Sequence, residues 1–317
     1  MGGATTLQNA AGFSVTLLER GAGIQAIGVP SRRGIVQTVL GYPDPDDYLN
    51  DRYYLGSTVG RYANRIRGGH LALPDGAHQL PVDAVTGHCL HGGPSGFHCQ
   101  HWQREPSAND ATVSYRLKSP DGDQGFPGEL AVTVTYALLA GTALAIDYVA
   151  ATTQTTAINL TNHAYFNLHG DGSAIDGHCL SIRASRYTPV DADKIPTGEL
   201  HDTHRTAMDF STERALSSDD VYDTNFALDP GAKALRPAAT LRSPKSGLQL
   251  IVHTTQPALQ LYTGDGLGEP FGPRAGLCLE TQHFPDAPNC PAFPSALLTP
   301  EQTYAHRTIM EFRESPT

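Results

Sequence analysis

Hydrophobic and polar residues alternate with a period of two along much of the chain. Near the start, Phe13, Val15 and Leu17 alternate with Ser14 and Thr16. Successive side chains of a strand point to opposite faces, so this pattern predicts a strand with one buried face. The same alternation recurs in residues 113–117, 132–138, 144–148, 248–252 and 308–312. These segments are predicted to be half-buried strands.

Turn-forming residues separate the predicted strands. The chain contains 32 Gly and 23 Pro, and they cluster in segments such as 42–47, 74–76 and 119–122. Such clusters favour turns. Helical periodicity is nearly absent, although short helical turns are expected at Ser217–Val221. Alternating strands and helices, which would indicate a doubly wound parallel sheet, are not visible, so we predict an all-β sandwich.

The sequence offers no mark of a domain boundary. It has no low-complexity linker, no run of like charges and no tandem repeat, so residues 1–317 are expected to form a single domain. The proline-rich stretch 285–300 also carries Phe293, Leu297 and Leu298. Because these are core-type residues, we expect an ordered loop that crosses a sheet.

Composition and charge exclude several classes of protein. Hydrophobic residues make up 39% of the chain, which is enough for a sizeable core, and the formal net charge is -10. Nucleic-acid binding needs clustered Lys and Arg, and none cluster along this sequence. No stretch approaches 18 apolar residues, and the first residues lack the features of a secretory signal. We expect a cytoplasmic protein without membrane or nucleic-acid partners, as a monomer or homodimer.

The cysteines and their neighbouring histidines raise the question of a metal site. Five scattered cysteines, an odd number, are expected to be reduced thiols. A His-Cys-x-His pattern occurs at residues 88–91 and again at 98–101. Imidazole and thiolate are the ligands that zinc prefers, but this spacing fits no common zinc motif. We therefore expect loop histidines and packed thiols, and no bound metal.

Known signatures of cofactor binding and hydrolysis are missing from the sequence. It has no G-x-x-x-x-G-K-[ST] motif, and the Gly21-x-Gly23 pair lacks the third glycine of a dinucleotide fingerprint. There is also no G-x-S-x-G elbow and no H-E-x-x-H motif. We expect no cofactor, no serine-hydrolase chemistry and no zinc-peptidase chemistry.

Four segments combine polar and aromatic residues in ways that suggest a sugar site: 60–66, 90–93, 159–168 and 277–286. The adjacent amide and guanidinium of Asn64 and Arg65 can bind vicinal hydroxyls. His91 precedes two glycines, where the backbone can bend closely around a ligand. Glu280 lies in an apolar run, where an unpaired charge is costly, so it is either a paired structural group or a general base. Ion-paired Arg65 and a loop histidine at His91 remain the structural alternatives.

Taken together, these segments resemble the aldose 1-epimerase (galactose mutarotase) family, from about Gly12 to Phe312. The matching motifs are Gly60-Arg61-Tyr62-Ala63-Asn64-Arg65-Ile66, Leu90-His91-Gly92-Gly93, Thr161-Asn162-His163-Ala164-Tyr165-Phe166-Asn167-Leu168, Gln260-Leu261-Tyr262-Thr263-Gly264 and Leu279-Glu280-Thr281-Gln282 with Pro285-Asp286. The resemblance implies a large antiparallel β-sandwich, which agrees with the alternation.

The resemblance also implies an enzyme that interconverts the α and β anomers of free aldoses such as galactose and glucose. His163 would be the general acid and Glu280 the general base, since ring opening needs one proton delivered and one removed. The residues implied to bind the sugar are Asn64, Arg65, His91, Asp223 and Gln260. Neither a cofactor nor a metal is implied.

Two segments depart from the family pattern. After Asp223 the family often has His-Asn-Phe, whereas this chain has Thr224-Asn225-Phe226. The turn at residues 122–128 resembles a family loop that is usually richer in Glu. We expect the second difference to affect sugar preference rather than chemistry.

Three other functions use the same residues. A glycoside hydrolase could employ Asp223 and Glu280 as its two carboxylates, although His163 would then have no role. A non-catalytic module could bind a sugar without converting it. A hexose-phosphate epimerase would need a basic phosphate pocket, and the sequence shows no Arg or Lys cluster to form one.

Overall fold

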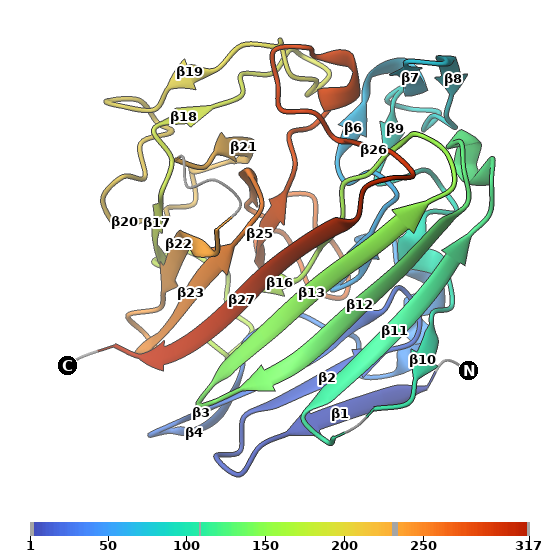
Figure 1. Cartoon of the computed structure of the whole chain (residues 1–317). Coiled ribbons are helices and arrows are strands. Elements are labelled where there is room, and N and C mark those ends of the chain that lie inside the picture. The colour runs from blue at the N-terminus through green and yellow to red at the C-terminus, as the bar shows by residue number, and fades with distance from the viewer. Residues whose placement is uncertain (1–2, 108, 230–233, 316–317) are drawn as a thin grey trace.

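A large antiparallel sheet extends across the centre of Figure 1. The structure, a computed structural model, describes residues 3–107, 109–229 and 234–315. The strands of this sheet follow the order β10-β11-β12-β13-β27-β23-β22-β17-β20. Their bounds are β10 Gln103–Glu105, β11 Thr112–Ser119, β12 Leu130–Leu139, β13 Ala143–Thr152, β17 Cys179–Ile182, β20 Arg214–Ala215, β22 Arg236–Arg242, β23 Leu248–Thr254 and β27 Tyr304–Glu314.

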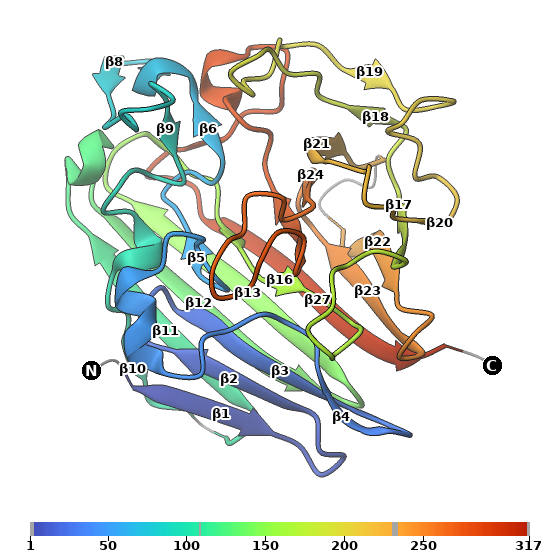
Figure 2. The ribbon, with the colours of Figure 1, turned by 180° about the vertical axis from the view of Figure 1, so that it is seen from behind.

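The second layer consists of two smaller sheets, seen in front in Figure 2. One has the order β1-β2-β3-β4 and the other β16-β25-β24-β21-β18-β19. A bridge between Val39 and Phe166 and a hydrogen bond from Leu40 N–H to the Tyr165 carbonyl (2.9 Å) join them. The bounds are β1 Ala4–Gln8, β2 Ser14–Leu18, β3 Gly23–Ser31, β4 Gly34–Gln37, β16 Tyr165–Phe166, β18 Arg186–Tyr187, β19 His201–Asp202, β21 Asp223–Ala227, β24 Ala258–Tyr262 and β25 Leu277–Gln282.

Short elements connect the two layers. The paired short strands are β5 Thr58–Val59 with β15 Thr161–Asn162, β6 Arg65–Ile66 with β9 Cys89–Leu90, β7 His70–Leu73 with β8 Gly76–Gln79, and β14 Thr156–Ala157 with β26 Leu297–Leu298. The helices of the described residues are all short 3₁₀ segments, namely η1 Pro45–Asn50, η2 Arg67–Gly69, η3 Phe97–Cys99, η4 Asp123–Gly125 and η5 Ala287–Asn289. The chain is thus an antiparallel β-sandwich, as predicted.

The hydrophobic core lies between the layers. In β12, buried and half-buried residues alternate over most of the strand, and Val132, Val134 and Tyr136 have no exposed surface. From the opposite layer, Phe13 packs against Phe312 with ring centroids 5.9 Å apart. Each large apolar side chain buried in this way contributes about 1.5–3 kcal/mol. The period-two segments therefore form the strands that enclose the core.

Every segment predicted as a strand from its alternation forms one. The proline-rich stretch is ordered too, and Phe293 and Ala296 lie in a buried hydrophobic cluster. The expected helical turn at Ser217–Val221 does not form. Instead Asp220 N–H donates to the Ser217 carbonyl (3.1 Å), and the Asp220 carboxylate accepts from Ser217 N–H (2.7 Å). This side-chain bond competes with helical hydrogen bonding and closes a tight turn before β21.

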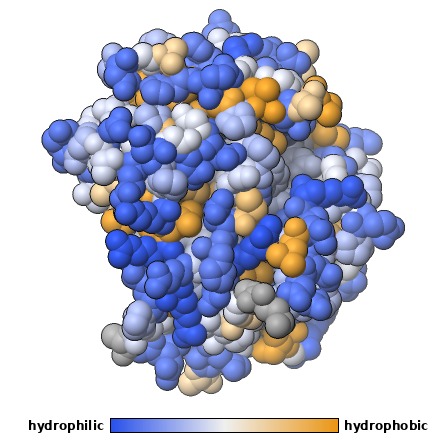
Figure 3. All heavy atoms as spheres, turned by 90° about the vertical axis from the view of Figure 1, so that its right-hand side faces the viewer, coloured by the Kyte–Doolittle hydropathy of each residue, from blue (hydrophilic) through white to orange (hydrophobic). Residues whose placement is uncertain are grey.

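The described residues form no helix of the length and hydrophobicity needed to span a lipid bilayer. On the face seen in Figure 3, hydrophilic residues predominate and the hydrophobic ones form separate groups. All five cysteines are free thiols.

Candidate active site

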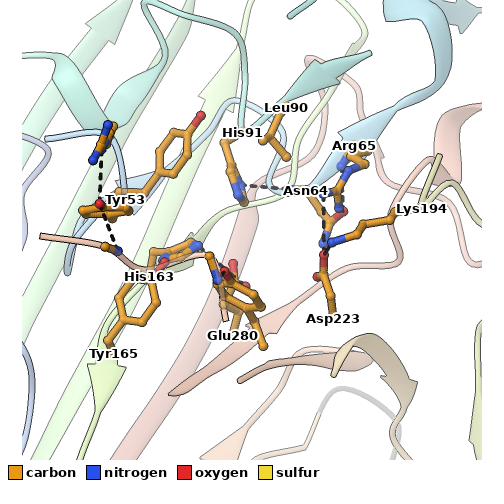
Figure 4. A pocket seen from close by; sticks show the side chains of 15 residues that line it. Tyr53, Asn64, Arg65, Leu90, His91, His163, Tyr165, Lys194, Asp223 and Glu280 are labelled. Atoms are coloured by element: carbon orange, nitrogen blue, oxygen red, sulfur yellow. Dashed lines mark hydrogen bonds and ion pairs between the residues drawn. The ribbon is translucent and has the colours of Figure 1, made fainter. Parts of the chain in front are cut away.

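A cavity of about 570 Å³ opens beside the six-stranded sheet of the second layer. Figure 4 shows its side chains. The lining residues are Arg52, Tyr53, Tyr54, Asn64, Arg65, Leu90, His91, His163, Tyr165, Lys194, Asp223, Tyr262, Gly266, Gly268 and Glu280. Six of the seven residues expected to bind or convert the sugar are among them, and Gln260 is the exception.

Strand register explains how one face of the sheet supplies the floor of this cavity. Asp223 of β21 is the partner of Tyr262 in β24, which in turn is the partner of Cys278 in β25. Two residues along each strand, Gln260 is the partner of Glu280. Because directly paired residues point to the same face, these polar side chains form adjacent rows on one side of the sheet.

His163 and Glu280 face each other across the floor, as Figure 4 shows. His163 follows β15, and its Nε2 lies 3.9 Å from Glu280 Oε1. Its Nδ1 lies 3.6 Å from the Cys278 thiol, so Nε2 is the nitrogen that faces the carboxyl group. Both side chains are almost fully buried, and Glu280 Oε2 has no hydrogen-bond partner among the described residues. A polar ligand would therefore find both groups available.

Burial separates the proton affinities of this pair. Desolvation, followed by the negative charge of Asp223, raises the pKa of Glu280 to about 8, against a lowering effect from Arg65. Desolvation lowers the pKa of His163 to about 4. Both effects disfavour the charged form of the group concerned. Between about pH 4 and pH 8, the empty site therefore holds a protonated Glu280 carboxyl group and a neutral His163 ring.

Asp223 is the centre of a charged cluster on one side of the cavity. Its carboxylate accepts from Lys194 Nζ (2.9 Å) and Gln260 Nε2 (2.7 Å), and it lies 3.5 Å from Arg65 Nη2. Although burial works in the opposite direction, the charges of Arg65 and Lys194 and these hydrogen bonds lower the pKa of Asp223. Asp223 is therefore a fixed negative charge. Gln260 holds it in place, and direct contact of Gln260 with a sugar stays a prediction.

Asn64 and His91 form a neighbouring part of the cavity wall through unusual backbone conformations. Both have positive φ angles, 66° and 52°, which are uncommon outside glycine. His91 Nδ1 accepts from the Asn64 N–H (3.1 Å), so in the neutral ring the proton is on Nε2. Desolvation lowers the pKa of His91 well below its usual value, which keeps the ring neutral. A Cβ on Gly92 would lie 2.0 Å from the Gly60 carbonyl oxygen, so the close approach requires glycine.

Tyrosine rings complete the walls, and the sequence analysis missed two of the four, Tyr53 and Tyr54. Tyr54 packs against His91 with ring centroids 4.6 Å apart and against His163 at 5.7 Å. Tyr165 lies 5.1 Å from His163 on another side. Of the tyrosines that line the cavity, only Tyr165 and Tyr262 lie within the motifs that match the family. Tyr54 has a positive φ of 57°, which no sequence pattern reveals.

Three cations line the cavity, namely Arg52, Arg65 and Lys194. Arg65 and Lys194 are paired with Asp223, whereas Arg52 Nε donates to the Tyr53 hydroxyl (3.2 Å). The sequence shows no run of Arg or Lys at these positions, because the three residues come from separate loops and strands.

One group of side chains could hold a metal ion. Among the described residues, His91, His163 and Glu280 have potential ligand atoms within 4.8 Å of one another. The other members of the His-Cys-x-His repeats do not join this group; His88 Nδ1, for example, accepts from Gly68 N–H (2.9 Å). A metal held by this group would contact both proposed proton-transfer residues, His163 and Glu280.

The two departures from the family pattern lie outside the cavity lining. Thr224 follows Asp223 in β21, so its side chain points to the other face of the sheet. The turn at residues 122–128 is held by the buried Arg61 guanidinium, whose Nη1 donates to the Gly128 carbonyl (2.9 Å). Its influence on sugar preference stays a prediction.

Comparison with known proteins agrees with this arrangement. The sequence model of the family described as aldose 1-epimerase matches residues 3–311. The chain is 40% identical over 316 residues to galactose mutarotase of Mus musculus. This alignment covers 95% of this chain and 91% of the mouse protein. It is 37% identical over 327 residues to aldose 1-epimerase of Escherichia coli K12, with 97% and 94% covered.

Solved structures give the same result. A GalM/aldose epimerase homologue from C. elegans superposes with a TM-score of 0.93 at 29% identity and covers 100% of both chains. Galactose 1-epimerase from Lactobacillus acidophilus superposes with a TM-score of 0.85 at 30% identity, covering 98% of this chain and 94% of that one. Sequence and fold agree over nearly the full length, and the chain belongs to the aldose 1-epimerase family.

Proposed function

We propose that the cavity exchanges the α and β anomers of a free aldose, with His163 as general acid and Glu280 as general base. The observation that carries this proposal is the 3.9 Å approach of His163 Nε2 to Glu280 Oε1 in a buried pocket. Anomer exchange requires a proton on the ring oxygen and the removal of another from the C1 hydroxyl. Two facing proton-transfer groups are sufficient for this reaction.

A bound sugar changes where the shared proton resides. Its C1 hydroxyl donates to the Glu280 carboxylate, and its ring oxygen accepts from protonated His163. Hydrogen bonds to a charged form favour that form, so the sugar moves the proton from Glu280 to His163. Glu280 then removes the C1 hydroxyl proton while the C1–O5 bond breaks and its electrons pass to O5. O5 takes the proton of His163, and C1 becomes an aldehyde carbon.

The pocket favours the protonation state that ring opening produces. Once the ring is open, Glu280 is protonated and His163 is neutral. This is the state that burial prefers, since burial raises the pKa of Glu280 to about 8 and lowers that of His163 to about 4. Binding that improves as the reaction proceeds lowers the barrier. Rotation about C1–C2 presents the other carbonyl face, and the reverse proton transfers close the ring as the second anomer.

The remaining polar groups position the sugar. His91 donates from Nε2, because its Nδ1 already accepts from Asn64. Arg65 and Asp223 lie together beyond Glu280 and offer one donor and one acceptor group to neighbouring hydroxyls. Fixed groups of this kind reduce the entropy cost of reaching the reactive geometry. Since several relatives are named galactose mutarotase, D-galactose is the first substrate to test.

Polarimetry of freshly dissolved α-D-galactose tests the activity. We expect faster relaxation to the same final rotation when the protein is present, unchanged by a chelator. Because kcat/KM reports the free enzyme, it should fall below about pH 4 and above about pH 8, where the pair carries two protons or none. Saturable binding without acceleration would indicate a sugar-binding module. Release of reducing sugar from a galactoside would indicate a glycoside hydrolase.

A further inference from the structure

The charge of the cavity differs in sign from that of the whole chain. The chain has a formal net charge of -10, yet Arg52, Arg65 and Lys194 line the cavity together with only two carboxyl groups. Asp223 is paired with both Arg65 and Lys194. The three cations thus outnumber the two carboxyl groups that line the cavity. The cavity is therefore positively charged, which favours anionic ligands.

Arg52 is the cation with no acidic partner. No Asp or Glu oxygen of the described residues lies within 4.0 Å of its guanidinium nitrogens, and its Nε donates to the Tyr53 hydroxyl (3.2 Å). The adjacent Asp51 is engaged elsewhere: its carboxylate accepts from the N–H groups of Tyr53 (3.1 Å) and Leu55 (2.8 Å). The terminal nitrogens of Arg52 are thus free to bind a carboxylate or a phosphate.

The expected orientation of the sugar brings its C6 group toward Arg52. In Figure 4, Tyr53 lies on the far side of His163, and Arg65, Lys194 and Asp223 lie on the opposite side beyond Glu280. If His163 protonates O5, then C5, which is bonded to O5, lies near His163. The C6 group leaves the ring from C5, away from Glu280 and the C1 hydroxyl. The hydroxyl of Tyr53 and the guanidinium of Arg52 are on this side.

We propose that the site accepts aldoses with an anionic group at C6, and that Arg52 binds this group. The inference rests on the proposed function, since the orientation of the ring follows from the roles of His163 and Glu280. The shared chemistry is a C6 anion next to a free C1 hydroxyl, supplied either by the carboxylate of a hexuronic acid or by a 6-phosphate. Arg52 is then a residue that determines specificity.

Anomer exchange measured by NMR magnetisation transfer tests the proposal. The sugars are D-galactose, D-galacturonate and D-galactose 6-phosphate, and the rate without protein is subtracted for each. The variant Arg52→Gln removes the charge, Arg52→Lys keeps it, and Arg116→Gln is a matched control at an exposed position of strand β11. We expect catalysed exchange of at least one acidic sugar. Its kcat/KM relative to galactose should fall about tenfold in Arg52→Gln, stay closer to wild type in Arg52→Lys and remain unchanged in Arg116→Gln.

The outcomes separate this inference from the proposed function. Exchange of galacturonate alone identifies a carboxylate ligand, and exchange of the phosphate alone identifies a phosphate ligand. Rising salt should lower kcat/KM for the acidic sugar more than for galactose, because it screens the exposed guanidinium. Exchange of galactose with neither acidic sugar overturns the inference and leaves the proposed function intact. An unchanged acidic-to-neutral ratio in Arg52→Gln also overturns it. If no sugar is exchanged, both proposals fail.

Discussion

Replacing Glu280 with Gln should remove activity and at the same time stabilise the fold at alkaline pH. Burial raises the pKa of this carboxyl from 4.5 to about 8 in the folded chain. Each pKa unit corresponds to about 1.36 kcal/mol, so keeping Glu280 ionised in the folded state costs roughly 5 kcal/mol above pH 8. A neutral amide of similar shape avoids this cost.

The sign of the pH dependence follows from proton binding. Between pH 4.5 and about 8 the folded chain keeps a proton on Glu280 that the unfolded chain has lost. The stability of the wild type therefore falls as pH rises through this window. Glu280→Gln lacks this dependence, so its melting temperature should be close to that of the wild type at pH 5 and several degrees higher at pH 9.

Calorimetry and polarimetry on the same protein samples provide the assay. General bases typically contribute about 10²- to 10⁴-fold, so kcat of Glu280→Gln should fall at least about 100-fold with a small change in KM. Exposed Glu199 offers a matched control, since Glu199→Gln should change neither quantity. A Glu280→Gln variant with more than a tenth of wild-type turnover, or with no gain in stability at pH 9, would refute the reasoning.

Five further predictions rest on the same geometry. His163→Ala should lower kcat for α-D-galactose far more than it changes sugar affinity, and comparable turnover would contradict the acid role. Asp223→Asn should shift the alkaline limit of kcat/KM to lower pH, because the charge of Asp223 raises the pKa of Glu280. Arg65→Ala should shift that limit upward and raise KM, and a pH titration of both variants checks the opposite signs. Zn²⁺ should inhibit competitively with the sugar through the His91, His163 and Glu280 ligand group, and chelator should reverse it. Gly92→Ala should destabilise the fold by more than about 1 kcal/mol, measurable by thermal denaturation, since its Cβ would meet a backbone oxygen.

The long strands could be predicted from the sequence because each buries one face. In β12, β13 and β27 the alternation extends over most of the strand, so the period-two pattern is visible. By contrast, β15 and β16 contain two residues each and provide no periodicity. Their positions depend on tertiary pairing, as in the bridge of β15 to β5. A pattern based on local alternation cannot detect such pairs.

The candidate site could be predicted only where its residues occur in compact motifs. His163 stands in a dense polar and aromatic segment and Glu280 is a lone carboxylate in an apolar run, and the structure brings them together from positions that are 117 residues apart. Arg52 and Lys194 come from loops without a recognisable pattern, and Lys194 has a positive φ of 62°. Their approach to the cavity depends on the path of these loops over the sheet, which the sequence does not reveal.

A double-mutant cycle tests the central claim most directly, namely that His163 and Glu280 act on one shared proton. Anomer exchange of α-D-galactose is measured for the wild type, His163→Ala, Glu280→Gln and the double variant. Residues that act as a unit show strongly non-additive effects. The account predicts that the double variant is slower than the slower single variant by no more than about threefold. If the losses of the two single variants multiply in the double variant, the two residues act independently and the shared-proton mechanism is wrong.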